Sequence, residues 1–179
     1  MEKDEKLKME LFRGLLKKFA GKSHKIYAED IAVPELLKGF GRLRFDKEKC
    51  WGCAACKVQC LEDALKVVEE GNKRIIQLDY WKCIACEECV KSCPKEAVKL
   101  EKTFSLKAFL SDKPIQCIEV ELSICSRCGG VIMPLPELKE VREKVSALNV
   151  PPHYFENISK LCEKCRRELT ATALIESRG

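Results

Sequence analysis

Apolar residues near the N-terminus recur at the spacing of an α-helix, with lysines between them. These apolar positions are Leu7, Leu11, Leu15, Leu16 and Phe19. Because residues three or four apart lie on one face of a helix, the pattern predicts an amphipathic basic helix. Gly14 weakens this helix slightly, since glycine costs about 1 kcal/mol more than alanine inside a helix.

The middle of the chain alternates between short apolar runs and turn residues. The runs that predict strands are 41–46, 64–68, 74–79 and 97–100. Gly71 and Asn72 predict the turn between the second and the third of these strands. Short helical turns are expected before the second strand and before the fourth, over 58–63 and 90–96.

The last third of the chain predicts one strand and two helices. The run IQCIEVEL at 115–122 reads as a strand. A helix is expected from Pro136 to Leu148, and two prolines that follow shortly afterwards stop it. A final helix is expected to begin at Cys165.

The cysteine content changes this picture most, because 13 of the 179 residues are cysteine. No apolar run approaches the roughly 20 residues that span a bilayer, and the N-terminus lacks the pattern of a signal peptide. We therefore expect a cytoplasmic protein, in which thiols stay reduced. Disulfides also consume cysteines in pairs, whereas 13 is odd. Metal ligation is favoured over disulfide bonds.

The positive charge is concentrated at the N-terminus. The net charge is +5, and residues 1–25 hold eight Lys or Arg against four Asp or Glu, so the rest of the chain carries only +1. A nucleic-acid-binding protein is expected to carry its basic patch on the folded body as well. The charge distribution therefore argues against nucleic acid as a partner.

Eight cysteines form two blocks with the same C-x2-C-x2-C-x3-C spacing. The first block is Cys50, Cys53, Cys56 and Cys60, and the second is Cys83, Cys86, Cys89 and Cys93. A shift of 33 residues superposes the blocks and also flanking residues, such as Asp46 on Asp79. The two segments are therefore an internal repeat, and two such units can share one core.

This spacing is typical of [4Fe–4S] ligation in bacterial ferredoxins. Three thiolates of a block wrap one cluster, and the fourth begins the next helix and faces the other cluster. The predicted ligands are Cys50, Cys53, Cys56 and Cys93 for cluster 1, and Cys83, Cys86, Cys89 and Cys60 for cluster 2. Zinc sites or unligated thiols fit less well, because zinc takes four ligands from separated pairs. Leu61 stands where a proline usually follows the fourth cysteine, which alters the loop but removes no ligand.

Residues 40–101 resemble the two-cluster ferredoxins, and this resemblance implies a βαββαβ core. The wider layout, a basic amphipathic segment followed by GRLRFDKEKC and both cysteine motifs, resembles the two-cluster subunit of respiratory complex I. It is more similar still to the corresponding subunit of membrane-bound [NiFe] hydrogenases and formate hydrogenlyase. The resemblance implies an electron relay at the inner face of the cell membrane, with hydrogenase-like small and large subunits as partners.

Two further C-x2-C pairs follow the repeat. Cys125, Cys128, Cys162 and Cys165 are predicted to hold one metal ion in a tetrahedral S4 site. Zinc and mononuclear iron both suit that geometry, and zinc is favoured because Arg166 replaces the glycine usual in a rubredoxin-like iron site. Unligated thiols are the weaker alternative. The ion would stabilise a segment that has few apolar anchors, and a similar ribbon occurs in some formate hydrogenlyase-type subunits.

These expectations describe an α+β protein in three parts. Residues 1–26 form a basic amphipathic docking segment, 27–105 a two-[4Fe–4S] ferredoxin domain, and 106–179 a zinc-ribbon-like domain with a helical insert. Residues 1–25 are expected to dock on a membrane subunit or on anionic lipid headgroups, with packing on the ferredoxin body as the alternative.

The remaining notable residues have plainer interpretations. Trp51 and Trp81 lie next to the cysteine blocks and are expected to shield the clusters from water. Cys117 is expected to be a small buried hydrophobe without a ligand role. His153 is expected to be a surface or packing residue, because four cysteines already fill the nearby S4 site.

No nucleophile–base pair, phosphate loop or nucleotide fingerprint is found in the sequence, so neither a catalytic site nor a small-molecule substrate is expected. The favoured function is electron relay in a membrane-attached hydrogenase or formate hydrogenlyase-type complex. A complex I-like quinone oxidoreductase subunit and a freestanding ferredoxin are the alternatives. A nucleic-acid-binding protein with iron–sulfur and zinc modules is a more remote one.

Overall fold

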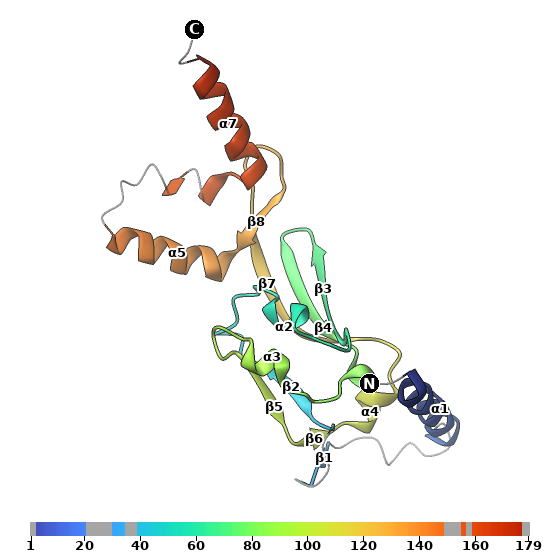
Figure 1. Ribbon diagram of the computed structural model, residues 1–179. Coiled ribbons are helices and arrows are strands. Elements are labelled where there is room, and N and C mark those ends of the chain that lie inside the picture. Colours follow the sequence, from blue (N-terminus) through green and yellow to red (C-terminus); the bar gives the residue numbers. More distant parts are fainter. Residues whose placement is uncertain (1–2, 21–29, 35–38, 149–154, 157–158, 177–179) are drawn as a thin grey trace.

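The structure is a computed structural model, and it describes residues 3–20, 30–34, 39–148, 155–156 and 159–176. The helix α1 (Lys3–Ala20) and the cysteine repeat lie at one end of the molecule, and α5 (Leu135–Ala147) and α7 (Glu163–Glu176) lie at the other (Figure 1). The long strand β7 (Ile115–Ile124) joins the two ends. The mixture of short sheets and separate helices agrees with the expected α+β class.

Two antiparallel strand pairs frame the cysteine repeat. β2 (Arg42–Phe45) pairs with β5 (Val98–Glu101), and β3 (Leu65–Glu70) pairs with β4 (Lys73–Leu78). Gly71 lies in the turn from β3 to β4 with a φ of 59°, a conformation that glycine adopts without strain. The four strands and the turn at Gly71 confirm the sequence prediction for this region.

The two short helices of the repeat begin earlier than predicted. α2 spans Ala55–Val58 and α3 spans Glu88–Lys91, so each lies inside its cysteine block. Ala54 and Glu87 precede these helices in the left-handed conformation, both with a φ of 64°. The sequence placed the helical turns further along because its apolar residues gave no indication that non-glycine residues would adopt this conformation.

The strand β7 adds to the hairpin of β3 and β4. It pairs with β4 on one side and with β8 (Val131–Pro134) on the other, which gives the order β3-β4-β7-β8. Buried and exposed residues alternate along β7, and Ile118, Val120 and Leu122 point into the core. The sheet therefore continues across the boundary that the sequence analysis drew between residues 105 and 106.

The core lies between this sheet and the cysteine loops. Its most deeply buried large side chains are Leu65, Ile76 and Leu78 from β3 and β4. Full burial of each of these side chains contributes about 1.5–3 kcal/mol to the stability of the fold. The thiols of Cys56 and Cys89 belong to the same buried cluster, so both halves of the repeat share one core.

Asp79 is the one charged residue buried in the described part of the chain. Its carboxylate contacts Lys66 Nζ at 2.7 Å and Lys82 Nζ at 3.3 Å. Burial opposes ionisation, but hydrogen bonds from Lys66 and Lys82 outweigh it, so the pKa of Asp79 lies below its usual 3.8. A carboxyl whose pKa is lower in the folded state stabilises the fold above its unfolded pKa, and this contribution is lost as the pH falls below about 4.

Asp79→Asn is therefore expected to lower the free energy of unfolding at pH 7 by about 1–3 kcal/mol, because two lysines lose their buried partner. The difference from the wild type should shrink as the pH falls from about 5 toward 2. Denaturant titrations at several pH values measure this. Asp63→Asn is the control, because the Asp63 side chain is exposed and its Oδ1 makes only a long contact, 3.7 Å, with Lys57 Nζ. If the difference in the free energy of unfolding did not change with pH, the lowered pKa of Asp79 would be contradicted.

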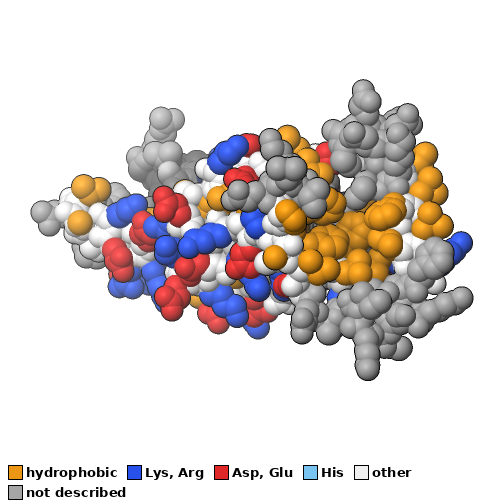
Figure 2. Space-filling view, turned by 90° about the horizontal axis from the view of Figure 1, so that it is seen from below, with side chains coloured by type: hydrophobic (Ala, Val, Ile, Leu, Met, Phe, Trp, Pro, Cys, Tyr) orange, Lys and Arg blue, Asp and Glu red, His pale blue; other side chains and the backbone are white. Residues whose placement is uncertain are grey.

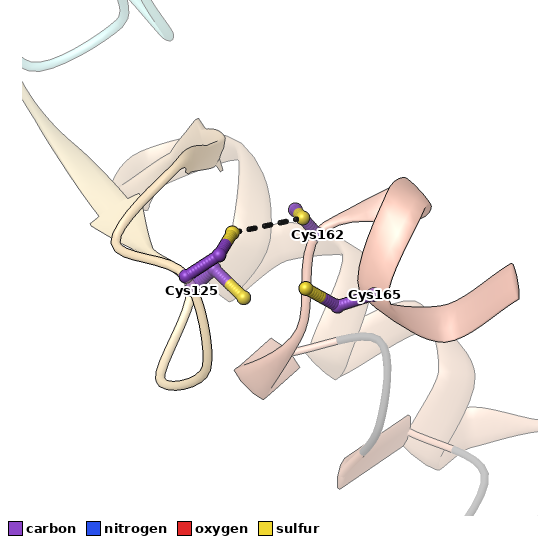
Figure 3. Close-up of side chains that lie close together, drawn as sticks. Cys125, Cys162 and Cys165 are labelled. Atoms are coloured by element: carbon purple, nitrogen blue, oxygen red, sulfur yellow. Dashed lines mark hydrogen bonds between the residues drawn. The ribbon is translucent and has the colours of Figure 1, made fainter. Parts of the chain in front are cut away.

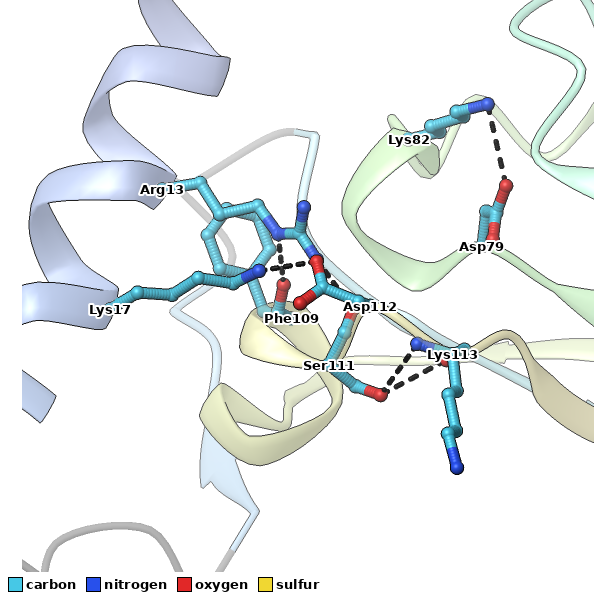
Figure 4. A network of polar contacts seen from close by, with 8 residues as sticks. All are labelled: Arg13, Lys17, Asp79, Lys82, Phe109, Ser111, Asp112 and Lys113. Atoms are coloured by element: carbon cyan, nitrogen blue, oxygen red, sulfur yellow. Dashed lines mark hydrogen bonds and ion pairs between the residues drawn. The ribbon is translucent and has the colours of Figure 1, made fainter. Parts of the chain in front are cut away.

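The helix α1 packs on the body through the apolar Leu16 and through two basic side chains. Arg13 Nε donates to the carbonyl oxygen of Phe109 at 2.8 Å, and the guanidinium also contacts Ser111 and Asp112 (Figure 4). Lys17 pairs with the same Asp112. Phe109 lies in α4 (Leu106–Leu110), so α1 rests on α4. Two basic side chains of the predicted docking helix are thus engaged within the chain.

Arg13→Gln is expected to weaken the docking of α1 by about 1–3 kcal/mol, because carbonyl and carboxylate partners lose a charged donor that is 12% exposed. Hydrogen exchange over residues 3–20 should become faster, while exchange in β3 and β4 stays slow. Lys18→Gln removes the same charge from an exposed position of the same helix and should leave exchange unchanged. Equal effects of both variants would show that net charge, rather than this contact, holds α1.

Candidate metal-binding sites

The first four-cysteine site is a small cavity beside β2. Cys50 and Cys53 come from the loop after β2, and Cys56 comes from α2. The fourth cysteine, Cys93, follows α3 and so comes from the other half of the repeat. Trp51 also lines this cavity, and Lys95 Nζ lies 4.1 Å from the centre of its ring.

The second four-cysteine site is a small cavity that is the counterpart of the first. Cys83, Cys86 and Cys89 come from the second block, and Cys60 comes from the first. The structure thus brings together the same two sets of four thiols that the spacing predicts, with the fourth cysteine exchanged between the halves.

Two matching backbone contacts produce this exchange. The N–H of Asp46 donates to the carbonyl of Ala97, just beyond Cys93, at 2.8 Å. The N–H of Asp79 donates to the carbonyl of Ala64, just beyond Cys60, also at 2.8 Å. Each half of the repeat is therefore hydrogen-bonded to the segment that follows the fourth cysteine of the other half. This crossing places the fourth cysteine of one block beside the other block.

The backbone of both loops also repeats. Positive φ angles occur in pairs 33 positions apart, and the pairs are Gly52 with Ala85, Ala54 with Glu87, and Asp63 with Glu96. Such conformations strain residues other than glycine, so their recurrence reflects a constraint common to both loops. At the first of these positions in each loop the backbone N–H donates to a thiol, from Gly52 to Cys50 and from Ala85 to Cys83.

Burial differs among the thiols of the two sites: Cys50, Cys56 and Cys89 are buried, whereas Cys53 and Cys86 are exposed. Burial raises the pKa of Cys56 to about 12 and that of Cys89 to about 11, and the neighbouring thiols add to this effect. At neutral pH these groups are protonated unless positive charge is brought to them. A metal centre in either site would therefore bind with release of protons, and its binding would stabilise the fold.

Trp81 has different surroundings from Trp51. Its ring lies under α1, with Arg13 Cζ at 4.9 Å and Lys82 Nζ at 5.5 Å from the ring centre. Trp81 precedes Cys83 by two residues but, unlike Trp51 in the first site, it does not line the second cavity. The sequence gave no indication that Arg13 would contact this tryptophan, because the two residues are far apart along the chain.

The S4 site at the other end of the molecule is also assembled. The sulfur atoms of Cys125, Cys128, Cys162 and Cys165 lie within 4.8 Å of one another (Figure 3). The turn between β7 and β8 supplies the first pair, and the start of α7 supplies the second. Ser126 N–H donates to the carbonyl of Lys160 at 2.9 Å, which fixes the two pairs against each other.

The four thiols of the S4 site differ in their acidity. Backbone N–H groups, that of Cys162 above all, lower the pKa of Cys125 to about 6. Burial raises the pKa of Cys165 to about 12, and the other three thiols contribute to this rise. Four sulfur ligands at this spacing suit one tetrahedral ion such as zinc or iron.

The other expected residues fall outside these sites. Cys117 lies half-buried in β7, where its Sγ donates to the carbonyl of Ile115 at 3.6 Å and burial raises its pKa to about 12. It lines neither four-cysteine cavity and is not part of the S4 site. His153 lies outside the described residues.

Two cavities, each lined by four cysteines within a duplicated strand–helix–strand unit, define an iron–sulfur domain of the ferredoxin type. Residues 49–97 match the family model of the 4Fe-4S dicluster domain. The chain therefore contains such a domain, which indicates an iron–sulfur cofactor and a role in electron transfer. A comparison with curated proteins finds no match. Among the described helices, none has the length and apolar character needed to cross a membrane.

Proposed function

We propose that the chain relays electrons through two [4Fe–4S] clusters, one in each four-cysteine cavity. Cys50, Cys53, Cys56 and Cys93 would hold the first cluster, and Cys83, Cys86, Cys89 and Cys60 the second. The single observation that carries this proposal is the exchange of Cys93 and Cys60 between the halves of the repeat. Such clusters, when bound, take up and release one electron at a time.

The exchange also brings the two sites close together. α2 and α3 pack against each other, and the thiols of Cys56 and Cys89 are near enough to interact electrostatically. Electron transfer between two centres slows steeply with distance, so this arrangement suits a relay. The chain's own contribution is to hold the ligands, to direct backbone N–H groups at the sulfurs and to limit the access of water.

We propose further that this relay is a subunit of a membrane-attached hydrogenase or formate hydrogenlyase-type complex, at the inner face of the cell membrane. The outer face of α1 supports a docking role. Its residues Leu7, Leu11, Phe12 and Leu15 are all more than half exposed, while Arg13 and Lys17 are turned to the body. An amphipathic helix with its apolar side outward suits a membrane subunit or a lipid surface.

The apolar surface extends beyond α1. Figure 2 shows a broad hydrophobic area on the face seen from below, and the exposed side chains of Ile31 and Phe40 belong to the same end of the molecule. These two residues line a groove of about 480 Å³ with Phe104. A relay that works alone has no need of such a surface, which favours a subunit over a freestanding ferredoxin.

The S4 site is proposed to hold one structural ion, zinc rather than iron. Its four thiols lie at the far end of the sheet from both four-cysteine cavities, which suits a stabilising role. In this position the ion would fix the start of α7 against the turn that follows β7.

Two measurements test the proposed assembly. The full chain, purified anaerobically, is expected to bind iron and sulfide and to be bleached reversibly by a low-potential reductant. Leu11→Glu, on the outer face of α1, should keep this behaviour but lose binding to membranes that contain the partner subunits. Glu10→Gln, at an exposed polar position of the same helix, serves as the control. Flotation with pure lipid vesicles separates a lipid surface from a membrane subunit. A Leu11→Glu variant that still binds membranes would overturn the docking proposal.

A further inference from the structure

We propose that Arg74 is a positioning residue that raises the reduction potential of the first cluster relative to the second. This inference rests on the proposed function, because it concerns the loop of the first site. The sequence repeat makes the two cysteine blocks nearly equivalent, whereas the contacts around them are not. Arg74 supplies one of these differences, beside the charged residues that line the cavities, which are Lys95 in the first and Glu62 and Glu87 in the second.

The guanidinium of Arg74 reaches from β4 into the first cysteine loop. Its Nη1 donates to the carbonyl oxygen of Gly52 at 2.8 Å. Its Nε and Nη2 donate to Glu69 Oε1 at 2.9 and 2.6 Å, and the side chain is only 17% exposed. Glu69 and Arg74 are opposite each other in the hairpin of β3 and β4. The positively charged guanidinium of this ion pair therefore faces the loop.

Gly52 is held on its other side as well. It lies between Cys50 and Cys53 with a φ of 74°, and a Cβ at this position would meet Val120 of β7 at 3.0 Å. The loop is thus clamped between β4 and β7. Because Gly52 N–H donates to Cys50, the clamp fixes a hydrogen bond to a predicted ligand.

The second loop has no such clamp in the described part of the chain. Ala85 stands where Gly52 stands in the first block, and no side chain is seen to donate to its carbonyl oxygen. The position 33 residues after Arg74 is Lys107, which lies in α4 rather than in a strand. The repeat therefore breaks down here, and the first loop alone receives a guanidinium.

Both effects of Arg74 favour the reduced cluster. Reduction adds negative charge, which a nearby cation and well-aligned N–H groups to the sulfurs stabilise. Glu69 offsets part of the charge but lies behind the guanidinium as seen from the loop. The first cluster is therefore expected to accept an electron more readily than it would without Arg74.

The test is a reductive titration of the anaerobically purified full chain, followed by electron paramagnetic resonance. Arg74→Gln should weaken reduction of the first cluster three- to tenfold, which corresponds to a fall of about 30–59 mV for one electron. The second cluster should stay unchanged, and Arg74→Lys should retain part of the effect. The resonance that disappears in Cys93→Ala identifies the first cluster.

Lys73→Gln is the matched control. Lys73 is the neighbour of Arg74 in β4, carries the same charge and pairs with Glu119 at 2.7 Å, and among the described residues it is not seen to donate to the first cysteine loop. Lys73→Gln should shift the reduction potential of neither cluster. Equal shifts in Arg74→Gln and Lys73→Gln, or no shift in either, would overturn the inference.

A second variant tests the inference in the case that Arg74→Gln fails to assemble the first cluster. Glu69→Gln keeps the donor to Gly52 and removes the offsetting carboxylate, so it should make reduction of the first cluster easier. An unchanged potential in Glu69→Gln would also overturn the inference. A wild-type chain that binds no iron and sulfide would instead refute the proposed function, and the two failures are therefore distinguishable.

Discussion

Cys93→Ala is expected to release the thiols of Cys50, Cys53 and Cys56, which belong to the other cysteine block. The reason is the crossing of the chain, which places Cys93 in the first cavity. A cluster that loses one of four thiolates loses its stable coordination, so the iron content should fall from about eight to about four per chain. The reciprocal variant, Cys60→Ala, should release Cys83, Cys86 and Cys89.

Alkylation of accessible thiols followed by peptide mapping identifies which cysteines each variant frees. Cys117→Ala is the control, because Cys117 lines neither cavity, and it should keep all of its iron. If Cys93→Ala frees Cys83, Cys86 and Cys89 instead, each cluster is held within its own block and the exchanged assignment is wrong.

Cys162→Ser is expected to remove the ion of the S4 site and to unfold the start of α7. Among the described residues, few contacts fix α7 and the segment before it to the turn after β7; Ser126 donates to the carbonyl of Lys160, and Arg127 pairs with Glu168 of α7 at 3.2 Å. Structural zinc contributes on the order of 10 kcal/mol to the folding of small metal-dependent segments, so its loss should have a large local effect.

Hydrogen exchange should therefore become fast over residues 125–130 and 159–176 in Cys162→Ser, and one equivalent of zinc should be lost. β3 and β4 should keep their slow exchange, because their core packs independently of the S4 site. Cys117→Ser is again the matched control. Retention of zinc and of slow exchange in α7 would show that the four thiols are not the ligands.

The cysteine sites were the most predictable part of the molecule, because ligand spacing is a local property of the sequence. The repeat of 33 residues predicts both sets of four cysteines, and the structure gathers each set in one cavity. The strands β2, β3, β4 and β5 were predictable from their apolar runs and from the turn at Gly71. Each of these predictions depends on residues that are close in sequence.

Contacts between distant segments were not predictable in the same way. The pattern of β7 predicts a strand but not its pairing with β4, because alternation identifies a buried face and not a partner. The same limit applies to Arg13 on Trp81 and to Arg74 on Gly52, since a basic side chain in a sequence of many lysines and arginines gives no sign of its acceptor. The early start of α2 depends on the left-handed Ala54, a conformation that sequence rarely reveals.

The basic N-terminal segment illustrates the difference between what the charge composition predicts and what the contacts show. Its excess of lysine suggested attraction to a membrane partner, and the structure turns Arg13 and Lys17 to Asp112 instead. The outer face is apolar, with Leu7, Leu11, Phe12 and Leu15 exposed. The proposed docking through α1 would therefore depend more on hydrophobic contact than the charge count implied.

The proposed relay requires that the exchanged cysteines hold two one-electron centres. Its most direct test is a reductive titration of the anaerobically purified chain, combined with iron and acid-labile sulfide analysis. The expected result is about eight iron and eight sulfide per chain, with about two electrons taken up reversibly. About four iron with one electron, or iron without labile sulfide, would contradict it.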